Sequence, residues 1–227
     1  MILKTEATVE DLARVPDHGK VELVHGELIL MSPAGGLHNV AAGEIYVSLR
    51  AYAKRTRTGT AFCDNAGFLV KLPHRQSFSP DAAFYTGPVT ASFLQGAPVF
   101  AVEVRSEGDY GQAAEQAMSD KRTDYFAAGT KVVWDVDLEG DTVVRSFQAE
   151  SPSEPACFRR GETANAEPAL PGWVMEVDDL FGSLITSLSF VGKPVRSMMN
   201  TAHNIAFFTG LTPNPFIRSQ NLINSKI

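Results

Sequence analysis

Two carboxylates in apolar surroundings are the residues of this sequence best suited to chemistry. Asp81 follows Pro80, and Glu103 comes about twenty residues later, each in a short apolar segment that predicts a β-strand. On adjacent strands they could project from one sheet face and hold Mg²⁺ or Mn²⁺, which prefer oxygen ligands. Such a metal orients and acidifies water for attack on a phosphodiester. The spacing also fits a plainer interpretation, a turn aspartate followed by a Glu–Arg pair at a strand end.

Arg105 and Lys121 are the cations that accompany these carboxylates. On a regular strand Arg105 shares a face with Glu103, because side chains alternate with a period of two. There it could balance charge on a phosphate, but an arginine cannot release a proton and so cannot act as general base. Lys121 lies on a predicted helix face that packs inward together with Ala114, Met118 and Tyr125. A lysine whose stem merely covers apolar surface remains the alternative.

Length and composition predict a globular protein. The 227 residues, 44% hydrophobic and 20% charged, suffice for one domain with a core, or for one domain with an appendage. The two cysteines lie far apart, which argues against a disulfide scaffold or a cysteine zinc site. The first fifteen residues lack a signal-peptide core and no run of eighteen apolar residues occurs, so a cytoplasmic protein without a membrane span is expected. The net charge of −6 argues mildly against a nucleic-acid coat protein, not against a nuclease.

Hydrophobic periodicity predicts an α/β fold with a mixed sheet. Helices are expected over residues 9–14, 37–56 and 112–128, and a hairpin over 21–24 and 27–31. Further strands are expected over residues 62–72, 79–85, 98–105, 131–136 and 142–147. Residues 171–181 are expected to close the core.

The end of the chain differs in composition from the rest. Residues 182–227 contain no Asp or Glu and four Lys or Arg, which leaves 16 basic and 26 acidic residues, a net charge of −10, in residues 1–181. The sequence therefore predicts a domain over residues 1–181 and a distinct C-terminal extension over residues 182–227.

Several blocks, in order from about residue 8 to residue 181, resemble the Uma-two family of endonucleases. They are ELVHGEL from Glu22, Pro80-Asp81, VEVRS from Val102, YFAAG from Tyr125, VWDVD from Val133 and LPGW from Leu170. That family belongs to the PD-(D/E)XK superfamily. The resemblance implies a restriction-endonuclease-like core of order α-β-β-β-α-β, with a central mixed sheet flanked by helices and an N-terminal β-hairpin.

The resemblance also implies roles for single residues. Asp81 and Glu103 correspond to the metal-binding carboxylates, while the position that is normally lysine holds Arg105, which puts catalysis in doubt. Lys121 matches a lysine of the family and offers a replacement. Glu22 and His38 match family positions as possible accessory residues. The alternatives are a surface hairpin carboxylate for Glu22 and a helix-capping or packing role for His38.

The function expected from these residues is Mg²⁺- or Mn²⁺-dependent hydrolysis of nucleic acid, with DNA as the expected partner. A catalytically inactive module that keeps the fold and binds nucleic acid or protein is the alternative. A metal-dependent hydrolase of another substrate is a third, since a fold does not fix a function. A homodimer is expected only by analogy with restriction enzymes, in which two sites meet two strands.

Overall fold

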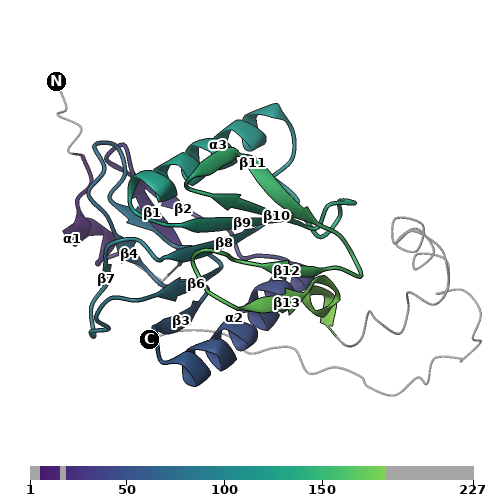
Figure 1. Cartoon of the computed structure of the whole chain (residues 1–227). Helices are drawn as coiled ribbons and strands as arrows, with labels where there is room; N and C mark the ends of the chain where they lie inside the picture. Colours follow the sequence, from purple (N-terminus) through teal and green to yellow (C-terminus); the bar gives the residue numbers. More distant parts are fainter. Residues whose placement is uncertain (1–5, 16–18, 183–227) are drawn as a thin grey trace, which may run out of the picture. The chain divides into compact units, whose positions relative to one another are not determined.

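A mixed β-sheet forms the centre of the computed structural model, which describes residues 6–15 and 19–182 (Figure 1). In this described part, six strands are hydrogen-bonded in the order β11 (Ser151–Phe158), β10 (Val144–Gln148), β9 (Val132–Val136), β8 (Phe100–Val104), β6 (Ala82–Tyr85) and β3 (Thr60–Cys63). The β8–β9 pair is parallel and the other pairs are antiparallel. The predicted mixed sheet is confirmed.

One face of the sheet packs against helix α2 (Gly36–Thr56) and the last described segment, which contains β12 (Thr163–Asn165), β13 (Val174–Glu176) and the 3₁₀ helix η2 (Val177–Phe181). Alternate residues of β8 point to this side, namely Phe100, Val102 and Val104. Trp173 packs against Phe100 and Trp134 with ring centroids 5.5 and 5.0 Å away. The predicted closing segment therefore does complete this core.

The opposite face carries helix α3 (Gln112–Ala127) and a small sheet of β4 (Phe68–Leu69), β5 (Ser77–Phe78) and β7 (Leu94–Gln95) (Figure 1). The buried ring of Tyr125 stacks on Phe78 with centroids 3.9 Å apart. Only the last turns of α3 are buried in this core, at Asp124 and Tyr125. The earlier turns of α3 are exposed or half-buried, and residues such as Ala114 and Met118 line a cleft.

The N-terminal hairpin is formed by β1 (Val21–Val24) and β2 (Glu27–Leu30), as predicted to within one residue. His25 and Gly26 make its turn, both with positive φ. The short helix α1 (Val9–Leu12) precedes it, and Thr8 caps that helix in a capping box with Asp11. The hairpin is joined to the small sheet because the hydroxyl of Ser77 accepts the Leu23 N–H at 2.8 Å.

Three expectations need correction. The strand expected over residues 62–72 is two strands, β3 and β4, in different sheets. Asp81 lies just before β6 rather than inside a strand, and Arg105 lies just after β8. Strands β11, β12 and β13 were not anticipated, because their patterns are mostly polar and exposed. Residues 183–227, nearly all of the predicted extension, lie outside the described residues, so the domain boundary stays a prediction.

Candidate active site

Asp81 and Glu103 lie side by side because of the register between β6 and β8. Ala83 faces Ala101 directly across this antiparallel pair, so residues 81 and 103 face each other two residues further on. The backbone fixes Asp81 from both sides: its N–H donates to the Val102 carbonyl at 3.0 Å, and its Oδ2 accepts the Val104 N–H at 2.7 Å. Asp81 is 3% exposed. A buried carboxylate is therefore held just before β6, opposite Glu103 of β8.

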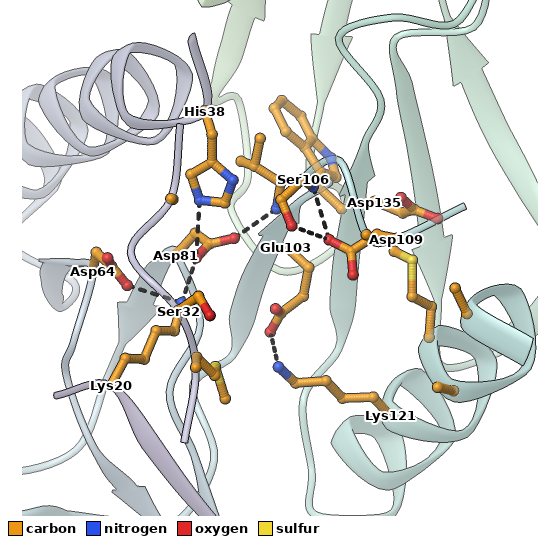
Figure 2. Close-up of a pocket in the computed structure, with 18 of the residues that line it drawn as sticks. Lys20, Ser32, His38, Asp64, Asp81, Glu103, Ser106, Asp109, Lys121 and Asp135 are labelled. Atoms are coloured by element: carbon orange, nitrogen blue, oxygen red, sulfur yellow. Dashed lines mark hydrogen bonds and ion pairs between the residues drawn. The ribbon is translucent and has the colours of Figure 1, made fainter. Parts of the chain in front are cut away.

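A cleft of about 800 Å³ opens over these carboxylates (Figure 2). Its walls come from the residues before β1, the loop before α2, the first turn of α2 and the inner side of α3. The charged residues and the histidine that line it are Lys20, His38, Asp64, Asp81, Glu103, Asp109, Lys121, Arg122 and Asp135. The predicted stripe of α3, including Ala114 and Met118, faces this cleft instead of a closed core.

Asp81 forms the centre of one half of the site. Its Oδ1 contacts the ammonium of Lys20 and lies 3.3 Å from Nε2 of His38. Burial raises the pKa of Asp81, but the hydrogen bond from His38 and the charge of Lys20 outweigh burial and hold it well below its usual range. Burial lowers the pKa of His38, and its bond to Asp81 more than offsets this, so that pKa is raised. Asp81 is thus a stable carboxylate with basic neighbours.

Glu103 forms the centre of the other half. Its Oε1 accepts from the Nζ of Lys121 at 2.9 Å and from the Tyr125 hydroxyl at 2.7 Å. Burial raises the pKa of Glu103; Lys121 opposes this rise, and the charge of Asp81 adds to it, so the pKa lies above its ordinary value. Burial also opposes the charge of Lys121, but Glu103 and Glu22 raise its pKa. Lys121 is therefore protonated.

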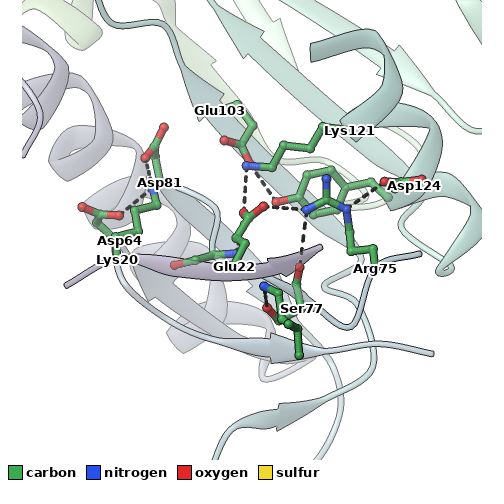
Figure 3. Close-up of polar contacts among 12 residues, drawn as sticks. Lys20, Glu22, Asp64, Arg75, Ser77, Asp81, Glu103, Lys121 and Asp124 are labelled. Atoms are coloured by element: carbon green, nitrogen blue, oxygen red, sulfur yellow. Dashed lines mark hydrogen bonds and ion pairs between the residues drawn. The ribbon is translucent and has the colours of Figure 1, made fainter. Parts of the chain in front are cut away.

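Glu22 supports this second half from the hairpin (Figure 3). Its Oε1 accepts from Lys121 and from the Ser79 N–H, both at 2.9 Å, and its Oε2 accepts from Arg75 at 2.6 Å. Arg75 in turn donates to Asp124 at 2.7 Å. From the sequence, Glu22 was a possible accessory residue or a surface carboxylate; in the structure it is buried and accepts hydrogen bonds at both oxygens. It fixes the position of the Lys121 ammonium.

Arg105 is directed away from this centre. Its Nε and NH2 donate to the two oxygens of Asp135, both at 2.8 Å, and its guanidinium also pairs with Glu115. The Arg105 side chain is 2% exposed and is not among the residues that line the cleft. Asp135 is buried as well, and Arg105 supplies it with a bidentate partner.

The structure therefore brings five of the predicted residues together, namely Glu22, His38, Asp81, Glu103 and Lys121, and separates Arg105 from them. Sequence reasoning missed Lys20, Asp64, Arg75 and Tyr125. One signal was available: Lys20 and Glu22 are two residues apart at a strand, and side chains with this spacing share a face. The contacts of Asp64 and Arg75 join segments distant in sequence and leave no local pattern.

The donor set suits a hard divalent cation. The carboxylates of Asp64, Asp81 and Glu103 line the cleft, and carboxylate oxygens are the ligands that Mg²⁺ and Mn²⁺ prefer. Within the described residues, no three His, Cys, Asp or Glu side chains form a ready metal cage. Mg²⁺ does not need one, because it keeps several waters and is held through one or two carboxylates. Asp81 and Glu103 fit that requirement.

Comparison with known proteins identifies the family and the fold. Residues 8–178 match the model of the Uma2 family, described as "Putative restriction endonuclease". The chain belongs to this family. The crystal structure of a protein from Anabaena variabilis, titled a "putative nuclease", superposes with a TM-score of 0.61 at 19% identity. That match covers 77% of this chain and 97% of the other, and at this identity it shows the fold alone.

Membership supports a nuclease and confirms the predicted restriction-endonuclease-like fold. No curated protein matches the sequence. Over residues 6–15 and 19–182, no helix is both long and apolar enough to span a membrane.

Proposed function

We propose that this protein is a divalent-metal-dependent endonuclease that hydrolyses phosphodiester bonds of DNA. The observation that carries the proposal is the pairing of Asp81 and Glu103 on neighbouring strands at an open cleft, with the Lys121 ammonium 2.9 Å from Glu103. The family supplies the nuclease class. The metal, the DNA substrate and the individual residue roles are the parts we propose.

Asp81 and Glu103 would hold Mg²⁺ or Mn²⁺, and the metal when bound would supply an acidified water and a Lewis acid. Val104 and Tyr125 keep the two carboxylates in place through their hydrogen bonds. The cleft wall formed by α3 would then lie against the bound nucleic acid. A cytoplasmic location would give such an enzyme access to DNA.

Lys121 would act on the phosphate as a fixed positive charge. An ammonium has three donors, and Lys121 uses two of them on Glu22 and Glu103. The third remains for a substrate oxygen in the cleft. Because both carboxylates raise its pKa, Lys121 would stabilise charge in the transition state rather than accept a proton. Arg105 would have no part in this chemistry.

The test is cleavage of supercoiled plasmid and of single-stranded DNA by the purified protein with Mg²⁺, Mn²⁺ or a chelator. We expect metal-dependent nicking or linearisation that is lost in Asp81→Asn and Glu103→Gln, with circular dichroism showing an unchanged fold. Full activity of either variant would rule out the assignment. Activity on RNA alone would correct the substrate.

One observation favours a second candidate, a nucleic-acid-binding module without catalysis. The carboxylates that would bind the metal are already paired with Lys20 and Lys121. Melting in the presence of Mg²⁺ or Mn²⁺ separates the candidates, because a ligand that binds only the folded protein raises its melting temperature. DNA binding with no metal-induced shift and no cleavage would establish the inactive module.

A further inference from the structure

Lys20 lies at the centre of the site although no family block includes it. It precedes β1, and its ammonium contacts Oδ1 of Asp81 and lies 2.9 Å from Oδ1 of Asp64 (Figures 2 and 3). The side chain is 15% exposed, so these two carboxylates replace most of its hydration. A cation is electrostatically most stable between two carboxylates, and the Lys20 ammonium occupies that position.

Both oxygens of Asp81 are occupied by donors. Oδ2 accepts the Val104 N–H, and that donor belongs to the last residue of β8 and cannot leave without disrupting the strand. Oδ1 faces His38 and Lys20. Lys20 sits at the end of a flexible four-carbon stem, and it alone of these donors has a second carboxylate to receive it. A metal that binds Asp81 therefore displaces Lys20 at the lowest cost.

We propose that Lys20 is the resident counter-cation of the metal site: it neutralises Asp81 in the metal-free protein and is transferred to Asp64 when the metal binds. This inference rests on the proposed metal-dependent function. Lys20 then competes with the metal and sets its affinity, and Asp64 is the acceptor that makes the displacement possible. Asp64 suits this, since its side chain is 40% exposed and can follow the ammonium.

Lys121 shows the contrast within the same cleft. Its partner Glu22 is itself fixed by Arg75 and by the Ser79 N–H, so the ammonium is held from several sides. Asp64, in contrast, is 40% exposed and accepts the N–H of its chain neighbour Asn65 at 2.8 Å. The two lysines therefore differ: Lys121 is a fixed charge, and Lys20 is an exchangeable one.

The experiment is calorimetric titration of Mn²⁺ into the full chain carrying Lys20→Met, Lys20→Arg or, as control, Lys71→Met. We expect Lys20→Met to bind Mn²⁺ about 10-fold more tightly, the scale on which neighbouring groups tune metal sites. Lys20→Arg, which keeps the charge, should stay near the parent, and so should the exposed Lys71→Met. Without metal, Lys20→Met should melt below the parent, and saturating Mn²⁺ should narrow that gap.

A double-mutant cycle with Asp64→Asn separates displacement from a general change of charge. In the parent background Asp64→Asn should weaken Mn²⁺ binding, because Lys20 then has Asp81 as its remaining carboxylate partner. In the Lys20→Met background it should have no effect. An equal loss in both backgrounds would show that Asp64 acts on the metal directly and would overturn the proposal.

Weaker or unchanged binding by Lys20→Met would also overturn it. If Lys20→Met does not fold, Lys20→Arg and Asp64→Asn still decide, since Asp64→Asn with parental affinity contradicts the transfer. Absence of Mn²⁺ binding in the parent would instead refute the proposed metal site itself.

Discussion

Two clusters of charged residues lie next to each other on one face of the central sheet. Glu103 and Asp135 are direct partners in the parallel register of β8 and β9, so their side chains share that face. Around Glu103 the partners are Lys121 and a tyrosine, and the group lines the cleft. Around Asp135, which also borders the cleft, the bidentate partner is Arg105, which does not; both side chains are 2% exposed.

The two cations differ in how many of their hydrogen-bond donors are paired within the protein. The guanidinium of Arg105 places a bidentate pair on Asp135 and turns its other edge to Glu115, so its donors are committed within the protein. In the described part of the chain, Lys121 pairs with two carboxylates, those of Glu22 and Glu103, and an ammonium has three donors. Two neighbouring carboxylate–cation pairs thus differ in kind. Asp135 with Arg105 is a structural pair, and Glu103 with Lys121 is a candidate reactive group.

Removing Arg105 is the change with the largest expected effect. Arg105→Met leaves Asp135 buried without its bidentate partner and should lower the free energy of unfolding by about 3 kcal/mol or more. Arg122 and Arg145, 3.6 and 3.9 Å from Asp135, compensate only in part. Denaturant unfolding measures this. The rate of DNA cleavage per folded molecule should stay within a few-fold of the parent, and a dead but stable variant would move Arg105 into the chemistry.

The matched control is Arg105→Lys. It keeps a charge beside Asp135 but loses the fork, so it should be less destabilised than Arg105→Met and should keep substantial activity. A variant as unstable as Arg105→Met would show that the bidentate geometry, more than the charge, holds Asp135.

Lys121→Met should have the next largest effect, and this effect should be on the cleavage rate and not on the free energy of unfolding. Loss of a charge contact in the transition state lowers the single-turnover cleavage rate by roughly 10²-fold, about 2.7 kcal/mol. Lys131→Met, an exposed lysine after α3, is the control. Cleavage by Lys121→Met at the parental rate would show that this ammonium only compensates Glu22 and Glu103.

The sequence predicted the helices and central strands better than it predicted which charged side chains pair with each other. Periodicity identified α2, α3 and the central strands, because burial of one face imposes that pattern locally. It placed Glu103 and Arg105 on one face correctly, but it could not show that Arg105 turns to Asp135, 30 residues away. Nor could it show that Lys20 reaches Asp81, 61 residues away. Ion-pair partners depend on tertiary packing, which local alternation does not encode.

Glu115→Gln should have the smallest effect. The hydrogen bond from Arg105 lowers the pKa of Glu115, against a weaker effect of burial, so its ionised form stabilises the fold. The side chain is 52% exposed, and solvent reduces the pair to about 0.5 kcal/mol. Because the folded pKa is the lower one, this stabilisation is present above the unfolded pKa, about 4.3, and is lost as the pH falls through the folded value. Urea midpoints at pH 7 and pH 3 test it: the variant should differ from the parent more at pH 7.

The most direct test of the whole account is Mn²⁺ titration of the parent, of the double variant Asp81→Asn/Glu103→Gln and of Asp135→Asn. Glu103 and Asp135 are neighbours on one sheet face and both line the cleft, so the three proteins compare a proposed metal site with a structural pair under identical conditions. We expect binding in the parent, none in the double variant, and near-parental affinity in Asp135→Asn. Loss of binding in Asp135→Asn together with parental binding in the double variant would contradict the account.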